Sequence, residues 1–227
     1  MTRFVLTDIE GTTTSITFVH DVLCPYARKR MADYVRMHSE EPQVKKCIEQ
    51  TLATIREEQG RDADLEGAIE QLIQWIDEDR KHPALKELQG YIWRFGYEKG
   101  DFKGHIYPDV LPKLKEWDCE GIHMGIYSSG SIEAQRLLFG FSEEGNLNGF
   151  FNANFDTSVG HKREMSSYAR IAAELELDPE EMLFLSDIGE ELDAAEAAGM
   201  QVLQLLRPGT EKAKGHMGVA DFSKIIL

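Results

Sequence analysis

The chain has 227 residues, of which 42% are hydrophobic and 29% charged, a balance typical of a globular protein with a substantial core. Its formal net charge of −15 at pH 7 argues against non-specific binding to nucleic acid or to an anionic membrane, so we expect neither as a partner. No apolar run is long enough to cross a bilayer, and no signal peptide precedes the first predicted strand. The three cysteines are widely spaced and form no Cys-x-x-Cys pair, which favours reduced thiols in a cytoplasmic protein.

The first predicted element is a short strand that ends at an acidic residue. Residues 4–7 form an apolar run typical of a buried strand, Asp8 follows at its end, and Glu10 comes two residues later. Gly11 then lets the backbone turn sharply. An acid at the carboxyl end of a parallel strand lies where open α/β sheets bind ligands, and two carboxylates beside hydroxyl residues could hold Mg²⁺. This pattern indicates phosphoryl transfer, with Asp8 as a covalent nucleophile.

A long helical region follows the first strand. Over residues 15–100 apolar side chains recur at helical spacing, and no convincing strand interrupts them. We expect Pro25 to end or kink the first of these helices. The sequence therefore predicts a helical cap at 15–100, inserted into a core formed by residues 1–14 and 101–227. Because the insert directly follows the first strand, it would lie over the carboxyl edge of the sheet as a lid.

The remainder of the chain alternates apolar runs with helical patterns. The predicted strands cover residues 122–127, 150–155, 182–185 and 201–206. Strands that alternate with short helices indicate a parallel sheet with helices on both faces. The predicted fold is therefore α/β, a Rossmann-like parallel sheet with an inserted helical cap. Residues 222–227 are expected to form either an edge strand or a docked tail.

Three further polar stretches follow predicted strands. Ser128 and Ser129 open a helix, where hydroxyls and free backbone N–H groups bind anions, although an ordinary helix cap explains the same pattern. Lys162 precedes a helix and could neutralise a phosphate, although most lysines in such positions are solvated. Asp187 could be a second ligand of Mg²⁺, or a residue that only favours the start of the next helix.

The order of these residues resembles the haloacid dehalogenase superfamily over essentially the whole chain. Longer runs are similar to the enolase-phosphatase (acireductone synthase) family. The run from Asp8 reads Asp-Ile-Glu-Gly-Thr-Thr-Thr, the run from Tyr127 reads Tyr-Ser-Ser-Gly-Ser-Ile-Glu-Ala-Gln, and the run from Phe184 reads Phe-Leu-Ser-Asp. Two residues depart from the expected patterns: Glu10 stands where the superfamily usually has aspartate, and Cys24 where phenylalanine is expected in the family.

The resemblance implies a two-step reaction of methionine salvage. The substrate would be a phosphorylated diketone, 2,3-diketo-5-methylthiopentyl-1-phosphate. The enzyme would first enolise it and then remove the phosphate through an aspartyl-phosphate, which yields the acireductone 1,2-dihydroxy-3-keto-5-methylthiopentene. Mg²⁺ would be the only cofactor.

The resemblance also implies a role for each site residue. Asp8 would be the nucleophile, and Glu10 would protonate the leaving enolate and then activate water. Mg²⁺ would be held by Asp8, by Asp187 and by Glu10, in this superfamily often through the main-chain carbonyl at that position. The phosphate would be bound by Ser128, Ser129 and Lys162.

Some alternatives stay open on the sequence. A general Mg²⁺-dependent phosphatase of small monoesters would use the same core. A non-enzymatic module that is phosphorylated at Asp8 as a signal would not need the insert or Glu10. The enolisation base could be Glu10 or a lid residue such as His20, and Glu191 could position Lys162 or lie solvated. We expect a monomer.

Overall fold

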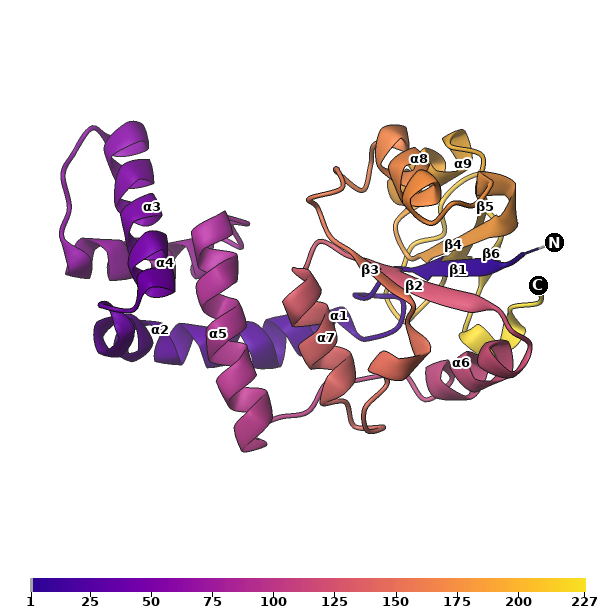
Figure 1. Cartoon of the computed structure of the whole chain (residues 1–227), viewed down its shortest axis with the longest axis horizontal. Helices are drawn as coiled ribbons and strands as arrows, with labels where there is room; N and C mark the ends of the chain where they lie inside the picture. The colour runs from indigo at the N-terminus through magenta and orange to yellow at the C-terminus, as the bar shows by residue number, and fades with distance from the viewer. Residues whose placement is uncertain (1) are drawn as a thin grey trace. The chain divides into compact units, whose positions relative to one another are not determined.

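The chain folds into two compact units, shown in Figure 1, a computed structural model that describes residues 2–227. The core unit comprises residues 2–18 and Lys103–Leu227, and the helical unit comprises Val19–Phe102. No helix within residues 2–227 is both long and apolar enough to span a bilayer. That the helical unit acts as a lid stays a prediction.

The core unit is built on a six-stranded parallel sheet. The strands are β1 (Phe4–Thr7), β2 (His123–Tyr127), β3 (Ala153–Phe155), β4 (Met182–Ser186), β5 (Gln201–Leu205) and β6 (Gly218–Val219). Their order across the sheet is β3-β2-β1-β4-β5-β6, and every neighbouring pair is parallel. Helices lie in the connections between the first five strands, which confirms the predicted parallel α/β sheet with an inserted helical region.

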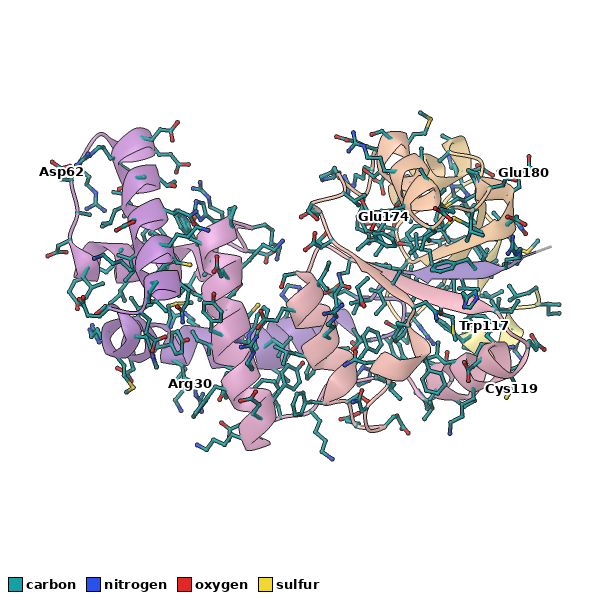
Figure 2. All side chains as sticks on the ribbon, in the orientation of Figure 1. Arg30, Asp62, Trp117, Cys119, Glu174 and Glu180 are labelled. Atoms are coloured by element: carbon teal, nitrogen blue, oxygen red, sulfur yellow. The ribbon has the colours of Figure 1, made fainter. Side chains whose placement is uncertain are left out.

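Helices cover both faces of this sheet. In Figure 1, α8 (Met165–Glu174) and α9 (Gly189–Ala197) lie on one side, and α6 (Val110–Cys119) lies on the other. The remaining long helix of the core unit is α7 (Ile132–Gly140), which follows β2. On α6, Trp117 is buried while Cys119 is exposed at the end of the helix (Figure 2).

The central strand is apolar because it is covered on both faces. All four residues of β1 are buried. Phe4 and Leu6 pack with Phe184 of β4, Tyr168 of α8 and Leu192 of α9 in one cluster. Each such side chain contributes roughly 1.5–3 kcal/mol through burial, so the strand that carries the site is fixed firmly in the core.

The helical unit has a hydrophobic core of its own. A π-helix at Val19–Leu23 leads into α2 (Cys24–His38), followed by α3 (Pro42–Gln59), α4 (Leu65–Asp77) and α5 (Pro83–Lys99). Met31 of α2, Val44 of α3, Leu72 of α4 and Leu88 of α5 are fully buried in one cluster. The apolar periodicity of this region therefore reflects helix packing within the unit.

The structure refines three local predictions. Pro25 lies in the first turn of α2, directly after the π-helix at Val19–Leu23, so the helical stretch changes its winding beside this proline and continues. The strand predicted at 150–155 is shorter, since a 3₁₀ turn at Asn148–Phe150 precedes β3. Residues 222–227 form the docked tail that was the second alternative: Phe222 and Ile225 are buried, a 3₁₀ turn covers Phe222–Lys224, and the edge strand is β6.

Candidate active site

Three strands deliver polar residues to the same edge of the sheet. Asp8 follows β1, Ser128 follows β2 and Asp187 follows β4. Thr7, the last residue of β1, is in register with Ile126 and with Leu185, so the three strand ends lie side by side. The carboxyl edge of a parallel sheet is where open α/β folds bind ligands.

A buried lysine links two carboxylates at this edge. Lys162 Nζ lies 2.5 Å from Asp8 Oδ1 and 2.6 Å from Glu191 Oε2. Only 5% of the Lys162 side chain is exposed, and the two carboxylates raise its pKa despite burial. Tyr168 fixes the backbone of the lysine, because its hydroxyl donates to the Lys162 carbonyl at 2.7 Å. The lysine is therefore a fixed positive charge beside Asp8.

Glu191 belongs to this cluster, although the sequence left its role open. Burial and the charge of Asp8 raise the pKa of Glu191 to about 7, against the opposing effect of Lys162. Ser186 Oγ also donates to Glu191 Oε2 at 2.9 Å. The side chain is therefore not a solvated first-turn acid, and it positions the lysine.

Glu10 lies against the serine that follows β2. Ser128 Oγ donates to Glu10 Oε2 at 3.1 Å and accepts from the backbone N–H of Gly130 at 3.1 Å. Burial, and then the negative charge of Asp8, raise the pKa of Glu10. Ser128 is fully buried, whereas the adjacent Ser129 is exposed. The two serines predicted together therefore differ in their surroundings.

Asp187 is a half-buried residue with one buried carboxylate oxygen that lacks a partner. Among the described residues, no hydrogen bond reaches its Oδ1. Burial and the charge of Asp8 raise the pKa of Asp187 to about 7. Gly11 packs against it so closely that a Cβ at this glycine would clash with Asp187 Oδ2. A buried carboxylate oxygen without a partner favours a bound cation.

The donor set fits a hard divalent cation, with a restriction. Within residues 2–227 no three His, Cys, Asp or Glu side chains are grouped as metal ligands, and the Glu10 carboxylate contacts Ser128 instead. Mg²⁺ often keeps several waters and takes only one or two carboxylates from the protein. Asp8 and Asp187 could therefore hold it, together with a main-chain carbonyl and water oxygens.

A cavity of about 660 Å³ in the core unit adjoins this edge. Gly11 and Asp187 line it on the side of the loop that follows Asp8 (residues 8–15, called the catalytic loop below), and Ile16, Tyr107 and Ala213 contribute apolar surface. Its size is in the range of pockets for small molecules. The core unit therefore has room for a small organic ligand beside Asp187.

One supporting residue was not predicted from the sequence. Gln135 of α7 is 1% exposed, and its Nε2 donates to the carbonyls of Gly130 at 3.0 Å and Phe155 at 2.8 Å. It thereby fixes the loop that carries Ser128. The only signal in the sequence is one polar residue on the otherwise apolar buried face of this helix.

Sequence comparisons identify the family. The profile of the haloacid dehalogenase-like hydrolases matches residues 2–199. A protein of Picosynechococcus named enolase-phosphatase E1 is 52% identical over 99% of this chain and 98% of its own length. An enolase-phosphatase E1 of Pectobacterium atrosepticum is 50% identical over 100% of this chain and 98% of its own length. The chain belongs to the enolase-phosphatases of the haloacid dehalogenase-like hydrolases.

Solved structures agree with this family membership. The UTR4 protein of Saccharomyces cerevisiae superposes with a TM-score of 0.82 at 31% identity, covering 99% of this chain and 100% of that one. CbbY of Rhodobacter sphaeroides, solved with phosphate, gives a TM-score of 0.61 at 16% identity, covering 99% of this chain and 96% of that one, and shows a common fold only. The sequence relatives named enolase-phosphatase E1 confirm the predicted resemblance, and the solved structures share the fold.

Proposed function

We propose that this enolase-phosphatase converts 2,3-diketo-5-methylthiopentyl-1-phosphate to the acireductone and phosphate. The observation that carries the proposal is the buried contact between Lys162 and Asp8 at the end of β1, in a chain about half identical to enolase-phosphatases E1. The negative charge of a carboxylate repels a phosphate group. A fixed ammonium group beside the carboxylate offsets this repulsion and so favours attack on phosphorus. Methionine salvage and a phosphorylated small-molecule substrate follow from the same family membership.

Asp8 would form the covalent intermediate. Lys162 donates to its Oδ1, so the other carboxylate oxygen, Oδ2, would be the atom that attacks. Its lone pair would form a bond to phosphorus as the bond from phosphorus to the substrate oxygen breaks. Lys162 and the loop that starts at Ser128 would hold the phosphate oxygens, with the exposed Ser129 at the rim.

Glu10 would move the protons of the phosphatase step. Its raised pKa keeps it protonated to a higher pH than an ordinary carboxyl group, so it can give its proton to the departing enolate oxygen. The resulting carboxylate would then take a proton from the water that attacks phosphorus and releases Asp8. Its contact with Ser128 holds it on the phosphate-binding side of Asp8.

Enolisation requires a base near the carbon that loses a proton. Glu10 is the candidate in the core unit, since a carboxylate with a raised pKa is a stronger base than an ordinary one. His20, in the helical unit, is the alternative.

Haloacid dehalogenase-like phosphatases generally depend on Mg²⁺, and the unpaired Asp187 oxygen supports such a site here. Asp8, Asp187 and the main-chain carbonyl of Glu10 would hold the ion. When bound, Mg²⁺ orients the phosphate and neutralises the charge that develops on it.

A timed ultraviolet spectrum with parallel measurement of phosphate tests the proposal. With Mg²⁺ and the diketo phosphate, enol absorbance should appear with or before free phosphate. Asp8→Asn should stop phosphate release while enol still forms. Phosphate without an enol product, or equal rates on generic phosphate esters, would instead indicate a general phosphatase. Stable phosphorylation by acetyl phosphate without turnover of any ester would indicate a phospho-acceptor module.

A further inference from the structure

A second buried cation in the core unit, which also lines the cavity beside Asp187, contacts the loop that follows Asp8. Arg207 follows β5, and 5% of its side chain is exposed. Its Nε and Nη2 donate to the Thr12 carbonyl at 3.0 and 2.9 Å. Thr12 lies in the turn that joins Asp8 to the start of α1 (Ile16–Phe18). A positive group therefore holds one specific peptide oxygen of the nucleophile loop.

The guanidinium is itself fixed on its other edge. Arg207 Nη1 and Nη2 donate to the two Asp109 oxygens at 2.9 and 2.8 Å, a bidentate pair. The Tyr107 ring lies 4.0 Å from the guanidinium carbon. Asp109 Oδ2 also accepts from the Phe222 backbone N–H at 2.8 Å. These contacts restrict the movement of the Arg207 guanidinium, and the Thr12 carbonyl that it binds is restricted as well.

The position of the Thr12 carbonyl matters because the loop is very tight. The backbone N–H groups of Thr12, Thr13 and Thr14 all point to the Ile9 carbonyl, at 2.9 to 3.1 Å. Gly11, one residue before Thr12, has a φ of +75° and leaves no room for a Cβ against Asp187. A shift at Thr12 would therefore move the backbone of Gly11 against Asp187 and change the spacing of the carboxylates.

We propose that Arg207, held by Asp109, is a positioning residue for the catalytic loop. It touches no reacting atom. It fixes the Thr12 carbonyl, and through it the distance between the Asp8 loop and Asp187. This inference rests on the proposed role of Asp8 as phosphoryl acceptor, but not on the identity of the substrate.

Gln204, the neighbour of Leu205 in β5, acts on the other loop of the site. Its Nε2 donates to the carbonyls of Asp187 and Glu211, both at 2.9 Å, and the side chain is 1% exposed. Residues at the end of β5 thus support both the loop that follows Asp8 and the loop that carries Asp187.

The test uses Arg207→Lys, with Lys113→Met as the matched control. A lysine keeps the charge but loses the paired donors to Thr12 and Asp109. Lys113 is also buried and also holds a carboxylate and a carbonyl, Glu116 at 2.7 Å and Ile225 at 3.2 Å, but it touches no part of the catalytic loop. Phosphate release from p-nitrophenyl phosphate, thermal unfolding, and binding of Mg²⁺ with beryllofluoride are measured for each variant.

We expect Arg207→Lys to lower kcat roughly 10- to 100-fold and to weaken beryllofluoride binding, with a smaller change in KM. Lys113→Met should lose at least as much thermal stability while its kcat stays at the wild-type value. If Arg207→Lys does not fold, Asp109→Asn loosens the same guanidinium and should lower kcat in the same direction. Wild-type kcat and beryllofluoride affinity in a folded Arg207→Lys or Asp109→Asn would overturn the proposal, as would equal losses of kcat in Lys113→Met. A wild-type protein that hydrolyses p-nitrophenyl phosphate but not the diketo phosphate would refute the proposed substrate alone.

Discussion

Two ion pairs of similar bond length, one in each unit, differ in their burial. In the helical unit, Arg28 pairs with Asp77 through bonds of 2.6 and 2.9 Å, yet both side chains are about half exposed. In the core unit, Lys162 and Asp8 are each 5% exposed in side-chain area. Pairs on the surface are screened by water and contribute little to stability, whereas a buried charge that loses its partner is costly. Burial, rather than bond length, therefore distinguishes the pair to which we assign a chemical role from the pair on the surface.

Of the substitutions considered, removal of Lys162 should have the largest effect on activity and stability. In Lys162→Met the Asp8 and Glu191 carboxylates remain buried without their shared cation. We expect phosphate release to fall by a factor on the order of 10² to 10³, because the substrate charge loses its fixed partner. Unfolding should become easier by about 3–5 kcal/mol. Steady-state kinetics and thermal unfolding measure the two effects, and a variant with near wild-type kcat would contradict the assigned role.

Substitution of Gly11 tests whether the site is as tightly packed as the structure shows. In Gly11→Ala the new Cβ would clash with Asp187 Oδ2, so the carboxylate must move. Gly60 provides the control, since its φ of +67° resembles the +75° of Gly11 but a Cβ added there would meet no atom within 4 Å. Both alanines carry a backbone cost of about 1–3 kcal/mol. Only Gly11→Ala should also abolish most phosphatase activity and weaken Mg²⁺ binding in calorimetry.

The third prediction follows from the pKa of Asp187. Burial raises this pKa to about 7, so in the metal-free protein the proton competes with Mg²⁺ for the carboxylate. As the pH rises from 6 to 8, the carboxylate loses its proton and the apparent affinity for Mg²⁺ should increase. Calorimetric titrations at the two pH values test this. An affinity that does not change with pH would show that Asp187 is not a ligand.

The ends of the strands and their succession along the chain could be predicted from the sequence, because apolar runs that stop at polar residues are local patterns. Asp8, Ser128 and Asp187 were found in that way. The contacts of Glu191, Gln135 and Arg207 could not, because each depends on a partner far away in the chain. A buried glutamine, a buried arginine and their solvated counterparts have the same sequence signature, and only the packed structure distinguishes them. The π-helix before Pro25 was also missed. A proline in the first turn of a helix and a proline that breaks a helix look the same in the sequence.

The smallest expected effect belongs to the surface pair. Arg28→Ala removes both bonds to Asp77 but leaves two solvated groups. We expect an unchanged kcat and a thermal midpoint close to that of the wild-type protein. A loss of activity comparable to that of Lys162→Met would refute the distinction between surface and buried pairs.

The most direct test of the account is chemical trapping of the phosphorylated enzyme. The protein is mixed with Mg²⁺ and the diketo phosphate, quenched within one turnover, and treated with borohydride, which reduces an acyl phosphate to an alcohol. Mass spectrometry of the peptide that contains Asp8 should then show homoserine at position 8, and Glu10 should be unmodified. Rapid release of phosphate with an unmodified Asp8, or with the label on another residue, would contradict the account.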